Sequence, residues 1–111
     1  MKIPLLVIIG PTAAGKTELG IKLAERIKGE IVSADSRQVY RFMDIGTAKP
    51  SMDERRSVQH YMIDVVNPDE EFTVADYVKG AGKAIREIFN KGKMPVMVGG
   101  TGLYVRAVVE G

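Results

Sequence analysis

Short apolar runs along the chain alternate with longer stretches in which apolar side chains recur every three or four residues. The run IPLLVII at 3–9 is apolar on both faces, which is typical of strands inside a parallel sheet with helices above and below. Similar short runs predict further strands at 30–35, 61–66 and 94–100. We expect the first strand to have a neighbouring strand on each side.

Helical patterns lie between these strands. A helix is predicted from about 16 to 28, and we expect Gly29 to end it. A single turn of helix is predicted at 51–57, and a last helix at 102–110. The inner stripe of the first helix is predicted to consist of Leu19, Leu23 and Ile27.

A longer helix is predicted at about 74–90, with Thr73 as its N-terminal cap. Strands that alternate with helices indicate an α/β fold with a mostly parallel sheet. The chain has 111 residues and no internal repeat or linker, and it does not supply a second neighbour for the first strand, so we expect it to be part of a longer protein. The inward side chains of the long helix are predicted to be Val74, Tyr77, Val78, Ala81, Ile85, Ile88 and Phe89.

Three polar clusters each follow a predicted strand. They are the glycine-rich loop from 10, DSRQVY at 35–40 and GGTGLY at 99–104. Ligands of parallel α/β sheets bind at the carboxyl ends of the strands. We therefore expect the three clusters to converge on one rim of the sheet.

The loop at 10–17 matches the pattern G-x-x-x-x-G-K-S/T in full, and it lies between a strand and an amphipathic helix, as this motif requires. Its glycines let backbone N–H groups point at phosphate oxygens, Lys16 adds a full charge, and the Thr17 hydroxyl is a ligand for Mg²⁺. The motif predicts a P-loop NTPase-like three-layer sandwich, although a strand-to-helix turn without a ligand is the alternative. The predicted phosphate cradle consists of Gly10, Pro11, Thr12, Ala13, Ala14, Gly15, Lys16 and Thr17.

Asp35 stands at the end of the second predicted strand. Its simplest interpretation is a carboxylate that caps a turn or helix, the usual role of such residues. Two chemical interpretations are a carboxylate that holds magnesium and a general base close to the phosphate loop. The position alone does not decide among them.

The last predicted strand ends in Gly99-Gly100 and is followed by Thr101. The glycines allow a ligand to approach the backbone closely, but they are also compatible with a turn before a helix that Thr101 caps. ATP- or GTP-hydrolysing P-loop proteins carry an Asp after an apolar strand, and this strand has none. The loop is therefore expected to bind a diphosphate without serving an ATPase motor.

Charge gives little guidance, because 16 Lys and Arg residues against 14 Asp and Glu residues leave a net charge of +2. Arg37, Arg41 and Lys49 lie beside the predicted site and either contact RNA phosphates or are solvated loop charges, which is the default. The charges at 53–57 are interpreted as a solvated helical face, and the single histidine, His60, as a structural or hydrogen-bonding residue.

The composition excludes two kinds of site and gives no membrane signal. The chain has no cysteine, so disulfides and thiolate metal sites are impossible. The N-terminal run at 3–9 leads directly into the phosphate loop, which favours a strand over a signal peptide. No apolar segment approaches the roughly 18 residues that span a bilayer. We expect a cytoplasmic protein.

Taken in order, five segments resemble the tRNA dimethylallyltransferases, also called tRNA isopentenyltransferases. The phosphate loop is common to many enzymes, whereas DSRQVY followed by DIGTAKP is specific to this family. The resemblance covers nearly the whole chain. The segments are GPTAAGKTEL at 10–19, SADSRQVYR at 33–41, MDIGTAKP at 43–50, HYMIDVVNPDEEFTVADY at 60–77 and GGTGLYVRAV at 99–108.

The resemblance implies transfer of a prenyl group from dimethylallyl diphosphate to N6 of the adenosine 3′ of the anticodon, in tRNAs that read codons beginning with U. It implies that the loop holds the diphosphate, with Thr12 in the part assigned to the donor and Mg²⁺ near Thr17. It also implies that Asp35 is the general base and that Lys16 and Thr101 serve catalysis. The residues implied to contact tRNA are Asp35, Ser36, Arg37, Gln38 and Thr101.

Members of this family are considerably longer, so 1–111 resembles the N-terminal portion of a P-loop prenyltransferase catalytic domain. The portion itself is expected to be inactive. The whole protein is expected to be a monomer that does not bind a membrane. Three other functions remain open. One is a P-loop kinase that phosphorylates a nucleotide or small molecule, and another is an adenylate isopentenyltransferase that acts on free AMP, ADP or ATP. The third is a nucleotide-binding fragment without catalytic activity.

Overall fold

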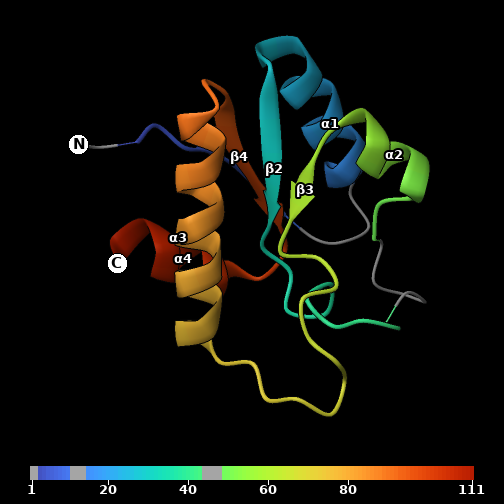
Figure 1. Ribbon diagram of the computed structural model, residues 1–111, viewed down its shortest axis with the longest axis vertical. Coiled ribbons are helices and arrows are strands. Elements are labelled where there is room, and N and C mark those ends of the chain that lie inside the picture. Colours follow the sequence, from blue (N-terminus) through green and yellow to red (C-terminus); the bar gives the residue numbers. More distant parts are fainter. Residues whose placement is uncertain (1–2, 11–14, 44–48) are drawn as a thin grey trace.

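The computed structural model describes residues 3–10, 15–43 and 49–111. Their strands form one sheet in the order β1-β4-β2-β3, and every pair of neighbours is parallel (Figure 1). This confirms the predicted α/β fold with a mostly parallel sheet. The elements are β1 (Leu6–Ile9), α1 (Lys16–Ile27), β2 (Gly29–Ser33), α2 (Met52–Ser57), β3 (His60–Tyr61), α3 (Val74–Asn90), β4 (Met94–Gly99) and α4 (Gly102–Glu110).

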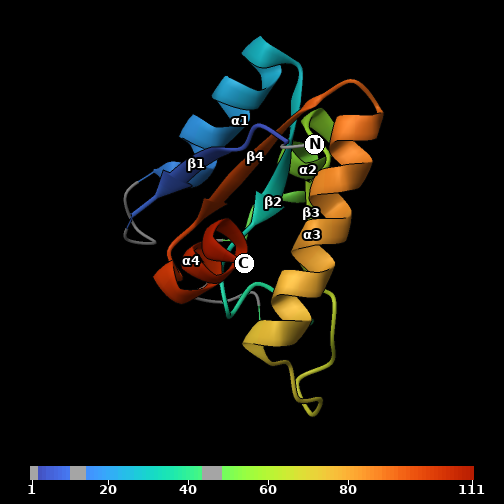
Figure 2. The same ribbon diagram turned by 90° about the vertical axis from the view of Figure 1, so that its left-hand side faces the viewer.

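Helices cover both faces of the sheet. Helices α1 and α2 lie on one side, and α3 and α4 lie on the other (Figures 1 and 2). Each side has its own core, because Ile21 and Ala24 of α1 pack with Ile31 and Val96, whereas α3 and α4 pack with Val32 and its neighbours. The molecule is thus a three-layer sandwich. Within the described ranges, every helix is too short or too polar to cross a lipid bilayer.

Strand β1 lies at an edge of the sheet and pairs only with β4 among the described strands. The second neighbour is not among the described strands, which agrees with the expectation that this chain does not supply it. The apolar character of the run remains visible at the surface, where Leu6 is 40% and Ile9 is 55% exposed.

The inward face of α1 differs from the predicted stripe. Leu19 is 57% exposed and Leu23 is half-buried, whereas Gly20, Ile21 and Ala24 are buried. A Cβ atom on Gly20 would lie 2.8 Å from Cγ2 of Val98, so the small residue lets the helix approach β4 closely. Ile27, the third member of the predicted stripe, is 36% exposed.

The C-terminus of α1 also differs from the prediction. Lys28, with φ 55°, adopts the left-handed conformation that ends the helix. Gly29 is the first residue of β2, where a Cβ atom would lie 2.6 Å from the carbonyl oxygen of Met94. Glycine is needed here for the close approach of two strands rather than for its own φ angle.

The strand predicted at 61–66 is much shorter in the structure. Only His60–Tyr61 pairs with β2, because Met62 and Asp64 adopt left-handed φ angles of 68° and 56°. Val66 then forms an isolated parallel bridge with Tyr40. The chain after β3 consequently runs beside the segment that follows β2.

The predicted bounds and N-terminal cap of α3 are confirmed. The Thr73 hydroxyl accepts a hydrogen bond from Asp76 N at 3.1 Å, and the Asp76 carboxylate accepts one from Thr73 N at 2.9 Å. Val74, Val78 and Phe89 are only half-buried. Its buried residues are Tyr77, Ala81, Ala84, Ile85 and Ile88.

A pair of tyrosines joins α3 to α4. The rings of Tyr77 and Tyr104 stack with centroids 3.9 Å apart and an interplanar angle of 11°. The Tyr77 hydroxyl donates to the carbonyl oxygen of Ser33 at 2.7 Å, and burial raises the pKa of this hydroxyl. The stack therefore connects both helices to the end of β2.

Candidate active site

The carboxyl ends of β1, β4 and β2 come together, as predicted from the three polar clusters. Gly10 N donates to the carbonyl oxygen of Gly99 at 3.3 Å, which holds the start of the phosphate-loop motif against the end of β4. Ala34 N donates to the Val98 carbonyl at 2.9 Å, and Thr101 N donates to the Ala34 carbonyl at 3.0 Å. The backbone alone thus fixes the three clusters beside one another.

At Gly99 the end of β4 lies close against the backbone that follows β2. A Cβ atom at this position would overlap the carbonyl group of Ala34 and lie 2.8 Å from its Cα atom. Both obstacles are backbone atoms, which cannot rotate away as a side chain does. The absence of a side chain at Gly99 therefore lets the segment after β2 lie against β4.

Replacing Gly99 with alanine should lower the free energy of unfolding by about 1–3 kcal/mol, as an overpacked core position does. Gly82→Ala is the matched control, because its Cβ atom would meet only the flexible Arg86 side chain at 3.4 Å. In the middle of α3 that change should be stabilising by about 0.5–1 kcal/mol. Urea unfolding of the two variants measures both values, and equal effects would contradict the steric role of Gly99.

Thr101 and Ser36, two of the predicted site residues, are in direct contact. Ser36 N donates to Thr101 Oγ1 at 2.9 Å, and the two hydroxyl oxygens are 3.4 Å apart. Thr101 occupies the N-cap position of α4 but makes no side-chain bond to that helix. Its hydroxyl therefore serves the loop after β2 instead of the expected cap.

Asp35 is buried, with 7% of its surface exposed. Its Oδ1 accepts hydrogen bonds from Arg37 N at 2.8 Å and Gln38 N at 3.3 Å, which is the turn-capping interpretation. Its Oδ2 has no hydrogen-bond or ion-pair partner in the part of the chain that the structure describes. One oxygen thus fixes the turn, and the other remains available for chemistry.

Lys16 and Thr17 open helix α1. Gly15, with φ 73°, is the N-cap and offers no side chain to the first turn, an arrangement that suits an anion at the helix N-terminus. Lys16 is buried, and its Cδ would lie 3.4 Å from a Cβ atom on Gly10, so this glycine makes room for the lysine stem. The remaining predicted cradle residues, Pro11, Thr12, Ala13 and Ala14, lie outside the described residues.

One small cavity joins the two halves of the site. Its volume of about 20 Å³ holds about one water molecule, so it connects polar groups rather than enclosing a whole substrate. Lys16 and Asp35 both line it, although they are 19 positions apart in the sequence. The polar residues around it are Lys16, Thr17, Ser33, Asp35, Gln38 and His60.

Three of these residues, Ser33, Gln38 and His60, are held by hydrogen bonds. The Ser33 hydroxyl donates to Gln38 Oε1 at 2.9 Å, and both side chains are buried. His60 Nδ1 lies 2.7 Å from the carbonyl oxygen of Val58, in agreement with the predicted hydrogen-bonding role. Burial lowers the pKa of His60, assisted by the nearby charge of Arg55, so the imidazole is neutral at pH 7.

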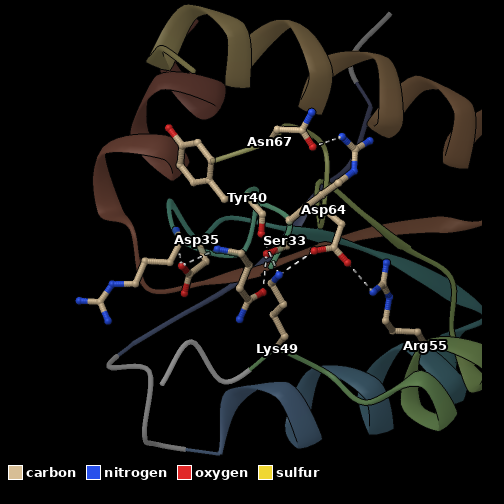
Figure 3. A network of polar contacts seen from close by, with 10 residues as sticks. Ser33, Asp35, Tyr40, Lys49, Arg55, Asp64 and Asn67 are labelled. Atoms are coloured by element: carbon tan, nitrogen blue, oxygen red, sulfur yellow. Dashed lines mark hydrogen bonds and ion pairs between the residues drawn. The ribbon is translucent and has the colours of Figure 1, made fainter. Parts of the chain in front are cut away.

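Lys49 is not the solvated loop charge that was expected, because its side chain is only 7% exposed. It donates to Asp64 Oδ1 at 2.6 Å and to the carbonyl oxygen of Tyr40 at 2.8 Å, and Arg55 NH1 contacts Asp64 Oδ2 at 3.0 Å (Figure 3). Burial alone would raise the pKa of Asp64, but the two cations hold it below its usual value. Sequence patterns missed this cluster, because its members are distant in the chain.

The other basic residues near the site are more exposed. Arg37 is exposed, and Arg41 NH1 donates to Asn67 Oδ1 at 3.1 Å. On α2, Arg56 contacts Asp53 at 2.9 Å with both side chains largely in solvent, as predicted, whereas Arg55 is only 26% exposed. The solvated-face prediction for 53–57 therefore holds for Asp53 and Arg56, whereas Glu54 and Arg55 are half-buried.

A family model described as IPP transferase matches residues 38–111. The chain is 64% identical over 107 residues to a tRNA dimethylallyltransferase of Desulforudis audaxviator, covering 96% of this chain and 34% of that protein. It is 59% identical over 109 residues to one of Caldicellulosiruptor saccharolyticus, covering 98% of this chain and 35% of that protein. The chain thus spans about a third of the length of these curated relatives.

A solved structure gives the same result for the fold. The tRNA isopentenylpyrophosphate transferase of Bacillus halodurans superposes with a TM-score of 0.93 at 51% sequence identity. The superposition covers 98% of this chain and 36% of that one. The similarity includes both the phosphate-loop side and the Asp35 side of the site, since nearly all of the chain is covered.

Proposed function

The chain belongs to the IPP transferase family, and from this premise we propose that the full-length protein is a tRNA dimethylallyltransferase. It transfers the dimethylallyl group of dimethylallyl diphosphate to N6 of the adenosine 3′ of the anticodon, in tRNAs that read codons beginning with U. The observation that carries the proposal is the cavity shared by Lys16, Thr17 and Asp35. It supports a diphosphate on one side and a proton acceptor on the other.

On the donor side, the allylic carbon–oxygen bond breaks and negative charge develops on the departing diphosphate. The Lys16 ammonium and the N–H groups at the start of α1 stabilise that charge, because they are held in place before the reaction. The burial of Lys16 supports this role, since electrostatic attraction is stronger away from bulk water. Gly10 to Thr17 form the proposed donor cradle.

On the acceptor side, the exocyclic amine is a poor nucleophile because its lone pair is delocalised into the adenine ring. As the new carbon–nitrogen bond forms, Asp35 Oδ2 accepts one proton from N6. The carboxylate thereby becomes a carboxylic acid, the amine remains neutral, and diphosphate leaves with the electrons of the broken bond. The turn bonds to Oδ1 support this role, because they hold the carboxylate in place.

The tRNA side of the proposal rests on the loop after β2. Ser36 and Arg37 are exposed beside the cavity, so they are available to a nucleotide extruded from its stack. Gln38 lines the cavity itself. The Thr101 hydroxyl accepts a hydrogen bond from the backbone N–H of Ser36. We propose that these four residues and Asp35 contact the target nucleotide.

Magnesium fits the proposed donor site in a limited way. The described residues contain no group of three or more His, Asp or Glu side chains that would hold a metal without a substrate. Mg²⁺ commonly binds through one or two protein oxygens, waters and substrate phosphates, and the Thr17 hydroxyl in the cavity is an oxygen of this kind. When bound there, the ion would neutralise charge on the diphosphate. Cytoplasmic location and a monomeric state complete the proposal.

The deciding experiment offers labelled dimethylallyl diphosphate and Mg²⁺ to the full-length gene product, together with tRNA, AMP or ATP. Label that appears on tRNA supports the proposal, whereas label on AMP or ATP would replace it with an adenylate isopentenyltransferase. In a parallel reaction with γ-labelled ATP, phosphate transfer to a small acceptor would replace both with a kinase. Added unlabelled ATP tests whether nucleotides compete for the loop.

A further inference from the structure

Three segments that are distant in the sequence meet at the Lys49 ammonium. Lys49 itself precedes α2, the carbonyl oxygen of Tyr40 belongs to the loop after β2, and Asp64 follows β3. The bond lengths of 2.8 Å to Tyr40 and 2.6 Å to Asp64 are those of strong, charge-assisted hydrogen bonds. Figure 3 shows Asp64 between Lys49 and Arg55, on the opposite side of Lys49 from Asp35.

The loop after β2 is a compact turn, residues 35–41, that is fixed at both ends. At one end, Asp35 Oδ1 accepts from Arg37 N, and Tyr40 N donates to the Arg37 carbonyl at 3.2 Å. At the other end, the Tyr40 carbonyl oxygen accepts a hydrogen bond from the Lys49 ammonium. A chain of hydrogen bonds therefore runs from Lys49 through Tyr40 and Arg37 to Asp35.

Asp64 serves this turn twice. Its backbone N–H donates to the carbonyl oxygen of Gln38 at 2.9 Å, while its carboxylate receives Lys49. It does so in a left-handed conformation, φ 56°, which is uncommon for a residue other than glycine and persists only when surrounding contacts hold it. The neighbouring backbone bonds from Val65 N to Val39 at 2.7 Å and from Arg41 N to Val66 at 2.8 Å extend the same attachment.

We propose that Lys49, with Asp64, is a positioning residue for the transfer reaction. This inference rests on the proposed function. Lys49 touches neither the donor nor the reacting amine; it fixes the Tyr40 end of the turn, so that Asp35 and Ser36 meet the target nucleotide in a reactive arrangement. Arg55 also pairs with the Asp64 carboxylate but does not contact the turn. A substitution of Arg55 therefore shows the effect of losing an ion pair without losing the contact to the turn.

The test compares Lys49→Met with Arg55→Met in the full-length enzyme. Each variant removes one cation from Asp64, but only the first releases the Tyr40 carbonyl. We measure steady-state rates with tRNA and dimethylallyl diphosphate, expressed per donor-binding site as counted by calorimetric titration with the donor. This normalisation removes any loss that comes from unfolded protein alone.

For Lys49→Met we expect turnover to fall at least about 10-fold and KM for tRNA to rise, because small displacements of reacting groups are costly. KM for dimethylallyl diphosphate should not change, since the proposed donor site is formed by Lys16 and the loop held against β4, and not by the turn that Lys49 fixes. Arg55→Met should change turnover by less than about fivefold, the effect of a partly exposed ion pair. Such a difference between the variants supports the inference.

Equal kinetics of the two variants, or wild-type kinetics of Lys49→Met per donor site, would overturn the inference and leave the proposed function standing. If Lys49→Met does not fold, Asp64→Asn decides, because it keeps the shape and one oxygen acceptor while removing the charge. A raised KM for tRNA with an unchanged KM for the donor supports the inference, and wild-type values overturn it. A wild-type enzyme that prenylates no tRNA would overturn the proposed function and this inference together.

Discussion

The Asp35→Asn variant of the full-length enzyme should transfer dimethylallyl groups about 10²–10⁴-fold more slowly than the wild type, the usual contribution of a general base. The asparagine side chain has the same shape, and its oxygen can still accept the bonds from Arg37 N and Gln38 N that hold the turn. Its amide group, however, cannot accept a proton from the adenine amine. Rapid-quench measurement of a single turnover isolates this chemical step from product release.

Donor binding separates a chemical defect from a structural one. Asp35→Asn should bind dimethylallyl diphosphate as tightly as the wild type, because the phosphate loop does not depend on this carboxylate. Asp53→Asn, the same substitution on the exposed side of α2, should leave both turnover and binding unchanged. A wild-type rate for Asp35→Asn would remove this residue from the mechanism.

Lys16→Ala should weaken donor binding and turnover together. Loss of a charged hydrogen bond to the diphosphate should reduce donor affinity roughly 10–100-fold. Turnover should fall by a further factor of about 10²–10³, since the charge on the departing diphosphate is greatest in the transition state. Calorimetric titration gives the affinity, and single-turnover rates at saturating donor give the remaining loss.

Lys22→Ala is the matched control for this substitution. Lys22 lies on the same helix, and its ion pair with Glu18 at 3.1 Å is exposed on both sides, so neither affinity nor turnover should change. If Lys16→Ala bound the donor as tightly as the wild type, the loop would not hold the diphosphate. Asp35→Asn is expected to lower turnover alone, whereas Lys16→Ala is expected to lower both turnover and donor affinity. This difference would assign Asp35 to the acceptor side of the cavity and Lys16 to the donor side.

The sequence predicted the features that depend on local rules. The capping box at Thr73 and Asp76 marks the start of α3, and the sheet is parallel because strands and helices alternate. The meeting of Lys16 and Asp35 follows from the same alternation, since carboxyl ends of parallel strands share one rim. The roles of these residues in catalysis remain predictions.

Other features depend on contacts that a sequence pattern does not contain. The buried face of α1 is set by Gly20, which lets the helix approach β4, and a search for large apolar residues selects Leu19 instead. Lys49 is buried because Asp64 and the Tyr40 carbonyl meet it from two other segments. The shortness of β3 also depends on distant contacts. The residues near Asp64 in the sequence do not indicate that it adopts a left-handed φ angle.

The stacked rings of Tyr77 and Tyr104 provide a built-in optical probe. The chain contains no tryptophan, so its own near-ultraviolet absorption comes chiefly from four tyrosines. The pair is bonded on one side to the Ser33 carbonyl, and on the other its α4 member donates its backbone N–H to Thr101. Any shift of the Ser33 carbonyl or of Thr101 that changes the distance or angle between the two phenol rings would alter their coupling and thereby the near-ultraviolet circular dichroism.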